Sequence, residues 1–203
     1  WRMRQGEGGA MAKECVCGRP VTLIGHIENF PDFPKPGVTF RDISPLLACH
    51  LAFDTAINEL SKIITSHRDC RDVTRAKSVK IAAVESRGFI FGAALAQKLN
   101  IGMVLLRKKG KLPGEIRSRD YGLEYGKDIL EIRRGILKPG EWVVLVDDVL
   151  ATGGTALAAS QLLKSEDAEV IGQAFLINLP ALNGADRLMR EDTKSPIGWV
   201  LEF

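Results

Sequence analysis

Apolar residues recur along the chain with two periods, and together they predict the elements of an α/β protein. Short apolar runs of the kind buried in parallel sheets predict strands at Val79 to Val84, Met103 to Leu106, Ile129 to Ile132, Trp142 to Val146 and Val170 to Ile177. Helical spacing predicts helices at Phe89 to Leu99 and Thr155 to Leu163. Because strands alternate with helices, the pattern favours a mostly parallel central sheet flanked by helices.

The part before the first strand has a different pattern. Val21 to Asn29 reads as a short helix, and residues 30–37 contain three prolines that exclude regular structure. Ser44 and Pro45 supply an N-cap and a first-turn proline for one long amphipathic helix that ends near His67.

Length and charge limit what this fold can carry. The chain has 203 residues and 45% hydrophobic content, which suit one sizeable core. Residues 1–20 are rich in glycine and charge and read as a flexible N-terminal extension or a remnant, which leaves 21–203 as a single domain. The net charge is +3, of which +2 falls in residues 1–20, so a nucleic-acid-binding surface is not expected.

Neither a membrane span nor a metal centre made of cysteine and histidine is expected. The sequence has no 18-residue apolar run and no secretory leader pattern, so the expected location is the cytosol. The four cysteines and three histidines show no zinc spacing, and the cysteines read as structural or incidental thiols.

The segment from Val143 to Ala156 carries the clearest chemistry. Gly153 and Gly154 allow backbone amides to approach a ligand, Thr152 and Thr155 add hydroxyl donors, and a helix N-terminus follows, so the turn predicts a phosphate seat. The pair Asp147–Asp148 would repel a phosphate and is expected to face ribose hydroxyls or Mg²⁺ instead.

A competing interpretation takes the apolar run and its acidic pair as the Walker B strand of an ATPase. That interpretation requires a G-x-x-x-x-G-K-[ST] loop, and the sequence contains none.

The same segment resembles the signature of the type I phosphoribosyltransferases. The resemblance implies their fold, with a mobile lid loop and a base-binding hood added to the sheet, and a donor substrate, 5-phosphoribosyl pyrophosphate. It implies that the acidic pair holds the ribose hydroxyls and that the loop holds the 5-phosphate, which gives a phosphoribose site of Asp147, Asp148, Ala151, Thr152, Gly153, Gly154 and Thr155. Mg²⁺ would be held mainly by the substrate, with Asp147 or Asp148 as possible ligands.

Three further stretches resemble the adenine-using members of that family: residues 30–45, 85–92 and 107–114. The resemblance implies an adenine site formed by Thr39, Phe40 and Arg41, largely through backbone groups, with Leu179 opposite. It also implies a pyrophosphate site that includes Arg87, because backbone amides and a guanidinium between a strand and a helix suit that anion.

Residues 107–127 hold seven Lys or Arg and four glycines, which predict a long basic loop that closes over a charged substrate. Arg107 and Lys111 are its candidate pyrophosphate ligands. The resemblance assigns Glu124 to proton transfer at adenine and Tyr125 to closure of the site. Exclusion of water matters because an oxocarbenium-like ribosyl cation would react with it.

The predicted reaction is adenine plus 5-phosphoribosyl pyrophosphate giving AMP and pyrophosphate, by an enzyme that the resemblance implies is a homodimer. The sequence departs from the family pattern at Gly122, at Asn178 and in the long polar stretch 68–78. These departures leave open an alternative, in which the chain is a catalytically weak or regulatory paralogue that binds AMP or the phosphoribosyl donor.

Overall fold

The computed structural model describes residues 22–66, 79–123, 126–191 and 195–203, and only the backbone of residues 121–123 and 126–128. The chain consists of two compact units, Trp1–Ala56 and Ile57–Phe203. The boundary falls inside helix α2 (His50–Ser66), and each unit is described by itself. The assignment of 21–203 to one domain therefore stays a prediction.

The first unit contains a two-stranded sheet. A 3-10 turn η1 (Leu23–His26) is followed by the antiparallel strands β1 (Glu28–Phe30) and β2 (Phe40–Asp42), with Glu28 opposite Asp42. Residues 31–39 between the strands contain no helix or strand, as their prolines require. The helix predicted from Val21 is therefore wrong beyond its single turn, because Glu28–Phe30 gain backbone partners in β2.

The long helix predicted from Ser44 is two helices. Helix α1 (Ser44–Ala48) ends at Cys49, whose backbone is extended at φ −104° and ψ 108°, and α2 starts at the next residue. Ser44 is the first helical residue and not the cap: its N–H and hydroxyl both donate to Asp42 Oδ1, at 3.0 and 2.7 Å. Cys49 is disulfide-bonded, so its expected state as a thiol is wrong.

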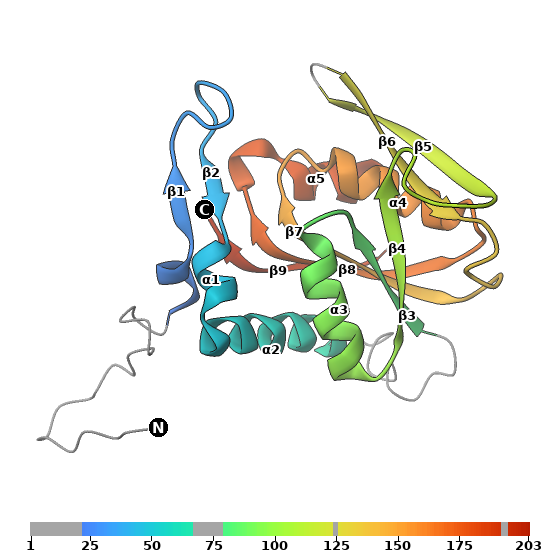
Figure 1. Cartoon of the computed structure of the whole chain (residues 1–203), viewed down its shortest axis with the longest axis horizontal. Helices are drawn as coiled ribbons and strands as arrows, with labels where there is room; N and C mark the ends of the chain where they lie inside the picture. The colour runs from blue at the N-terminus through green and yellow to red at the C-terminus, as the bar shows by residue number, and fades with distance from the viewer. Residues whose placement is uncertain (1–21, 67–78, 124–125, 192–194) are drawn as a thin grey trace, which may run out of the picture. The chain divides into compact units, whose positions relative to one another are not determined.

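The second unit is built on a seven-stranded sheet (Figure 1) with the order β5-β6-β4-β3-β7-β8-β9. Its strands are β3 (Val79–Val84), β4 (Gly102–Lys108), β5 (Ile116–Leu123), β6 (Gly126–Arg133), β7 (Trp142–Leu150), β8 (Glu169–Asn178) and β9 (Ile197–Glu202). Strands β4, β3, β7, β8 and β9 are parallel, while β6 is antiparallel to both β4 and β5. The predicted mostly parallel α/β sheet is confirmed.

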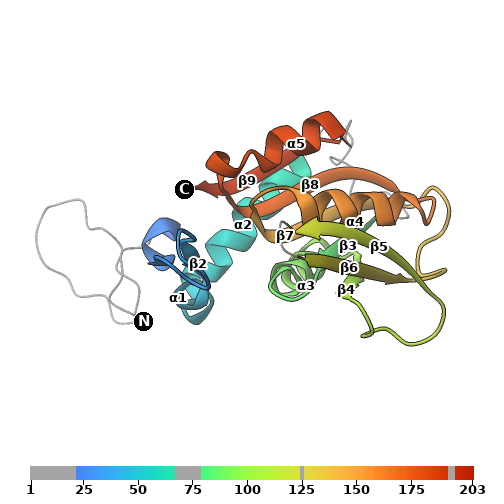
Figure 2. The ribbon, with the colours of Figure 1, turned by 90° about the horizontal axis from the view of Figure 1, so that it is seen from above.

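Helices α3 (Gly88–Leu99) and α4 (Gly154–Lys164) cover opposite faces of this sheet (Figure 2). Gly92 of α3 lies against Ala83 and Ile81, whereas Ala82 belongs to the core cluster that contains α4. Neighbouring residues of a strand point to opposite faces, so the alternation along β3 supplies both cores.

The basic segment predicted as a long loop is mostly a β-hairpin. Strand β4 runs to Lys108, residues 109–115 form the irregular connection, and β5 pairs with β6 from Ile116 opposite Arg133 to Leu123 opposite Gly126. Strand β5 is the edge of the sheet, where polar side chains meet solvent, so it lacks the apolar run by which strands were recognised.

Two C-terminal elements were not expected from the pattern, helix α5 (Gly184–Glu191) and strand β9, with a 3-10 turn η3 (Pro180–Leu182) before them. Every residue of β9 is partly or largely exposed, so it too lacks a buried apolar run. None of the helices in the described parts of the chain is long and apolar enough to cross a membrane.

Candidate active site

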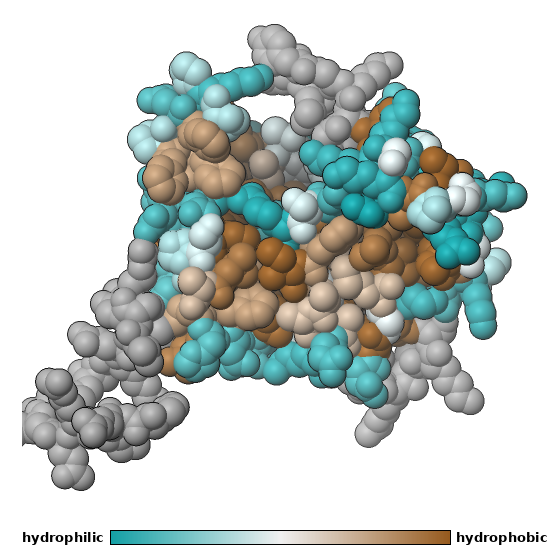
Figure 3. Space-filling model, in the orientation of Figure 1, coloured by the Kyte–Doolittle hydropathy of each residue, from teal (hydrophilic) through white to brown (hydrophobic). Residues whose placement is uncertain are grey.

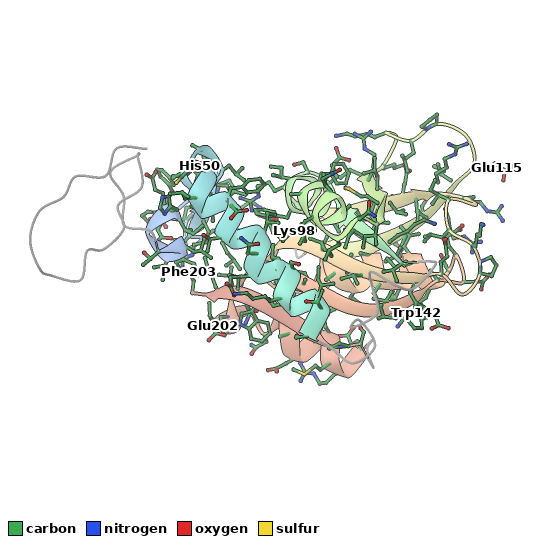
Figure 4. All side chains as sticks on the ribbon, turned by 90° about the horizontal axis from the view of Figure 1, so that it is seen from below. His50, Lys98, Glu115, Trp142, Glu202 and Phe203 are labelled. Atoms are coloured by element: carbon green, nitrogen blue, oxygen red, sulfur yellow. The ribbon has the colours of Figure 1, made fainter. Side chains whose placement is uncertain are left out.

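The acidic pair lies near the carboxyl end of β7. Figure 4 labels Glu202 at the carboxyl end of the parallel strand β9, and Trp142 at the opposite end of the strands, where β7 begins. Asp148 is buried, and its backbone N–H donates to Asp147 Oδ1 at 2.9 Å. Arg87 Nε lies 2.7 Å from Asp148 Oδ2.

Burial dominates the electrostatics of this pair. It raises the pKa of Asp147 well above its usual value, and the neighbouring charge of Asp148 raises that pKa further. Burial also raises the pKa of Asp148, against the guanidinium of Arg87, which lowers it. Two carboxylates held this close favour a cation or hydroxyl donors beside them, which suits the predicted contact with ribose hydroxyls.

The phosphate loop follows directly. Ala151 to Gly153 connect β7 to the first residue of α4, and Gly153 has φ +77°, a conformation that glycine adopts without strain. No side chain caps α4, so the N–H groups of its first turn, which have no partner within the helix, point towards the loop. Thr152 is exposed and Thr155 is half-buried, which leaves both hydroxyls within reach of a ligand. A glycine turn before a helix N-terminus is an arrangement that can bind an anion, and the phosphate seat itself stays a prediction.

A residue that the sequence reading did not single out supports this loop. A Cβ on Gly184, the first residue of α5, would lie 2.8 Å from Gly153 N and closer still to Ala151 O. Only a glycine allows α5 to approach the loop so closely. The sequence signal was the pair Asn183–Gly184, which is also a common turn dipeptide and was therefore not informative by itself.

Arg87 and Gly88 bring the start of α3 to the same edge. Arg87 is the N-cap of α3, and a Cβ on Gly88 would lie 2.7 Å from Asp147 Oδ1. The absence of a side chain at Gly88 therefore lets the helix start beside the acidic pair. This confirms that residues 85–88 close a strand and open a helix.

The two other predicted pyrophosphate ligands converge on Glu85, whose side chain is 8% exposed. Lys111 Nζ lies 2.7 Å from Glu85 Oε1, Arg107 Nε donates to Oε2 at 3.3 Å, and the Lys108 N–H donates to Oε2 at 2.9 Å. Burial alone raises the pKa of Glu85, but these hydrogen bonds outweigh it and lower the pKa to about 2. Each of the three cationic side chains predicted to bind pyrophosphate is thus paired with a carboxylate of the protein: Arg87 with Asp148, and Arg107 and Lys111 with Glu85.

The predicted base-binding residues fall in both units. In the first unit, Phe40 packs edge-on against Phe33 with ring centroids 5.4 Å apart, and Arg41 Nη1 donates to Asn29 Oδ1. Thr39 beside them is exposed.

In the second unit, Leu179 follows β8, and its N–H donates to Leu150 O at 3.0 Å, which places it beside the end of β7. Asn178 before it is 3% exposed, and its Oδ1 has no hydrogen-bond partner among the described residues. Glu124 and Tyr125, the predicted catalytic residues, lie outside the described residues.

The residues at this edge suit Mg²⁺ only as part of a shared coordination sphere. No group of three or more His, Cys, Asp or Glu that could hold a metal occurs within the described ranges. The two carboxylates of Asp147 and Asp148 offer the hard oxygen ligands that Mg²⁺ accepts, and Mg²⁺ commonly takes its remaining ligands from substrate phosphates and water.

The fold and this site define a class of protein, and comparison with known proteins identifies it. The family model of the phosphoribosyl transferase domain matches residues 49–199, and the chain belongs to that family.

Within that family, it belongs with the adenine phosphoribosyltransferases. It is 41% identical over 203 residues to the adenine phosphoribosyltransferase of Rhodopseudomonas palustris, covering 100% of this chain and 96% of the relative. It is 50% identical over 162 residues to that of Mastomys natalensis, covering 80% and 87% of the two chains.

Solved structures agree. The adenine phosphoribosyltransferase of Thermoanaerobacter pseudethanolicus matches with a TM-score of 0.79 and 41% identity, over 90% of this chain and 100% of that one. The Saccharomyces cerevisiae enzyme, solved with adenine and an imino-altritol bisphosphate, matches with a TM-score of 0.78 and 33% identity, over 88% and 96%. The resemblance noted from the sequence, and its type I fold, are confirmed.

Proposed function

We propose that this chain transfers the 5-phosphoribosyl group of 5-phosphoribosyl pyrophosphate to adenine, giving AMP and pyrophosphate. The observation that carries this proposal is the continuous phosphoribose site from Asp147 to Thr155, with an acidic pair and a helix-terminal phosphate loop side by side. Relatives that align with this chain over nearly their whole length and bear the name adenine phosphoribosyltransferase support adenine as the base.

In the proposed mechanism the chain acts chiefly by positioning. The first-turn amides of α4 bind the 5-phosphate, and Asp147 and Asp148 orient the ribose hydroxyls. Arg87, Arg107 and Lys111 then stabilise the negative charge that develops on the pyrophosphate as it leaves. Since these cations already pair with Asp148 and Glu85, the donor exchanges one set of anionic partners for another.

The base enters on the far side of the ribosyl carbon. Thr39, Phe40, Arg41 and Leu179 are proposed to hold adenine, and Glu124 to manage its ring proton while Tyr125 helps to close the site. A carboxyl group enclosed with the substrate has its neutral form favoured by desolvation, which suits proton exchange with a purine nitrogen. Mg²⁺, when bound with the donor at the acidic pair, would neutralise pyrophosphate charge.

We also propose that the protein is a homodimer. Apolar side chains gather over α3 and β4 (Figure 3), where Ile90 and Leu105 are 38% and 40% exposed. Leu105 is paired with Ala83, which faces α3, so the side chain of Leu105 lies on the face of the sheet that α3 covers. A second copy covering this face would remove the exposed apolar area from water.

The oligomeric state is measurable by light scattering. Ile90→Arg is expected to give monomers, whereas Ile136→Arg, which changes a 41% exposed isoleucine in the β6–β7 connection, is the matched control and should not. A monomeric wild type, or equal effects of the two variants, would exclude this interface. The cytosolic location stays a prediction.

Turnover tests the activity directly. Purified protein with adenine, donor and Mg²⁺ should form AMP and pyrophosphate in equal amounts, and Asp148→Asn should abolish most of this rate. Donor or AMP binding without turnover would instead identify the regulatory paralogue.

A further inference from the structure

Glu166 lies just beyond the C-terminal end of α4, at a place that is unfavourable for a carboxylate. Helix C-termini carry partial negative charge and attract cations, and a buried carboxylate is costly unless it is paired. The Glu166 side chain is nevertheless only 6% exposed. Its presence there requires partners that bind both of its oxygens.

Both oxygens have partners, and these partners come from two different segments. Arg117 Nε of β5 forms an ion pair with Glu166 Oε1 at 2.6 Å that lacks hydrogen-bond geometry, and the Gly135 N–H donates to Oε2 at 3.1 Å. Gly135 lies in the connection from β6 to β7, two residues after β6 ends. The carboxylate therefore connects strand β5, and the segment that follows β6, to the end of α4.

The helix that Glu166 follows is the one whose other end binds phosphate. Helix α4 starts at Gly154, directly after the phosphate loop, and β5 packs along it. The hairpin continues from Arg117 towards residues 124 and 125, to which the proton transfer and closure are assigned. Helix α4 thus lies between the predicted phosphate seat at its start and the contact of Glu166 with β5 beyond its end.

A buried ion pair is a poor way to gain stability alone, because well-packed apolar residues often serve as well or better. What it supplies is position, because the ion pair to Arg117 and the hydrogen bond from Gly135 attach the carboxylate to two separate segments. We propose that Glu166 is a positioning residue, which acts through Arg117 to hold the hairpin in register with the phosphate seat so that water is kept from the ribosyl carbon. This inference rests on the proposed transfer reaction.

Loss of the Glu166–Arg117 contact should therefore increase hydrolysis of the donor relative to transfer. In transfer, a ring nitrogen of adenine bonds to the ribosyl C1, the bond from C1 to the pyrophosphate oxygen breaks with its electron pair leaving on pyrophosphate, and the base loses its ring proton. In the side reaction, a water oxygen bonds to C1 instead, pyrophosphate leaves in the same way, and the water proton passes to solvent. The products then are ribose 5-phosphate and pyrophosphate.

The molecule offers a matched control for a purely structural role. Glu141, whose side chain is 8% exposed, pairs with Lys80 and accepts the Lys138 N–H at 2.8 Å. It therefore has the same kind of partners as Glu166, a cation and a backbone N–H. It lies next to Trp142 (Figure 4), at the same end of the sheet as Glu166, and its partners Lys80 and Lys138 come from β3 and from the connection between β6 and β7.

The test measures ribose 5-phosphate and AMP formed from the donor at saturating adenine, in wild type and in E166Q, R117Q, the double variant and E141Q. We expect the ratio of ribose 5-phosphate to AMP to rise about threefold or more in E166Q and R117Q, with no further rise in the double variant because the two residues act as one unit. E141Q should lower the melting temperature and leave the ratio at the wild-type value.

An unchanged ratio in E166Q, or an equal rise in E141Q, would overturn the proposal. If R117Q does not fold because the buried Glu166 carboxylate is left unpaired, E166Q decides, because Arg117 is 40% exposed and E166Q leaves no buried charge without a partner. Wild-type AMP formation tests the transfer reaction separately, because the proposed function fails if the wild type forms no AMP. In that case, the rate of donor hydrolysis compared across the same variants still tests the role of the Glu166–Arg117 ion pair.

Discussion

The glycine that supports the phosphate loop gives a prediction that can be worked out from the structure. In Gly184→Ala, the new Cβ would lie 2.8 Å from Gly153 N and 3.0 Å from Ala151 C, and closer still to Ala151 O. All of these are backbone atoms, so the contact cannot be relieved by rotating a side chain. Either α5 or the loop that binds the 5-phosphate must move.

Two effects of opposite sign set the size of the change. Alanine favours a helix interior over glycine by up to about 1 kcal/mol, and less at the first position of a helix. Overpacking a tight contact costs about 1–3 kcal/mol, so destabilisation should win. For a chain of this length, that corresponds to a drop in Tm of about 2–12 °C. Loss of one hydrogen bond to the charged phosphate would also raise KM for the donor by about tenfold or more.

The assay compares KM for the donor, KM for adenine and Tm in Gly184→Ala and in Gly102→Ala. Gly102 is the matched control, because its added Cβ would meet nothing closer than Lys80 Cγ at 3.5 Å, an ordinary contact. We expect the donor KM to rise only in Gly184→Ala, with the adenine KM nearly unchanged. A wild-type donor KM in that variant, or the same rise in Gly102→Ala, would refute the idea that this glycine shapes the phosphate seat.

Three further outcomes are expected. Glu124→Gln should lower kcat while leaving donor affinity nearly intact, and a large affinity loss at unchanged kcat would contradict its role in proton transfer. Because folding lowers the pKa of Glu85 from 4.5 to about 2, its contribution to stability is complete above pH 4.5 and is lost as the pH falls towards 2. The free energy of unfolding, measured in urea across that range, should depend less steeply on pH in Glu85→Gln than in the wild type. An identical slope would argue against the pairing. Asp148→Asn removes a carboxylate proposed to hold the ribose hydroxyls and should raise donor KM together with its loss of turnover, measured by initial rates. An unchanged donor KM would show that Asp148 does not contact the ribose.

The sequence predicted the centre of the fold better than its periphery, for a physical reason. Strand β3 has the predicted bounds, Val79–Val84, because all of its residues except the partly exposed Lys80 are buried and apolar. The phosphate loop was also predictable, since a glycine turn between a buried strand and a helix has few other uses.

Elements whose stability depends on distant partners were missed or misjudged. Strand β5 is polar along most of its length and is a strand only because β6 lies beside it. The break between α1 and α2 at Cys49 could not be predicted, because no proline or glycine occurs there. The pairing of Glu85 with Arg107 and Lys111 was not predicted, because more than twenty residues separate them along the chain and only the fold brings them together.

The central claim is that this site uses adenine, and one competition measurement tests it most directly. Purified protein is supplied with 5-phosphoribosyl pyrophosphate, Mg²⁺ and an equimolar mixture of adenine, hypoxanthine, guanine and orotate, and the nucleotides formed are separated and counted. AMP should account for nearly all of the product. Formation of IMP, GMP or orotidine monophosphate at rates equal to or above that of AMP would contradict the assignment.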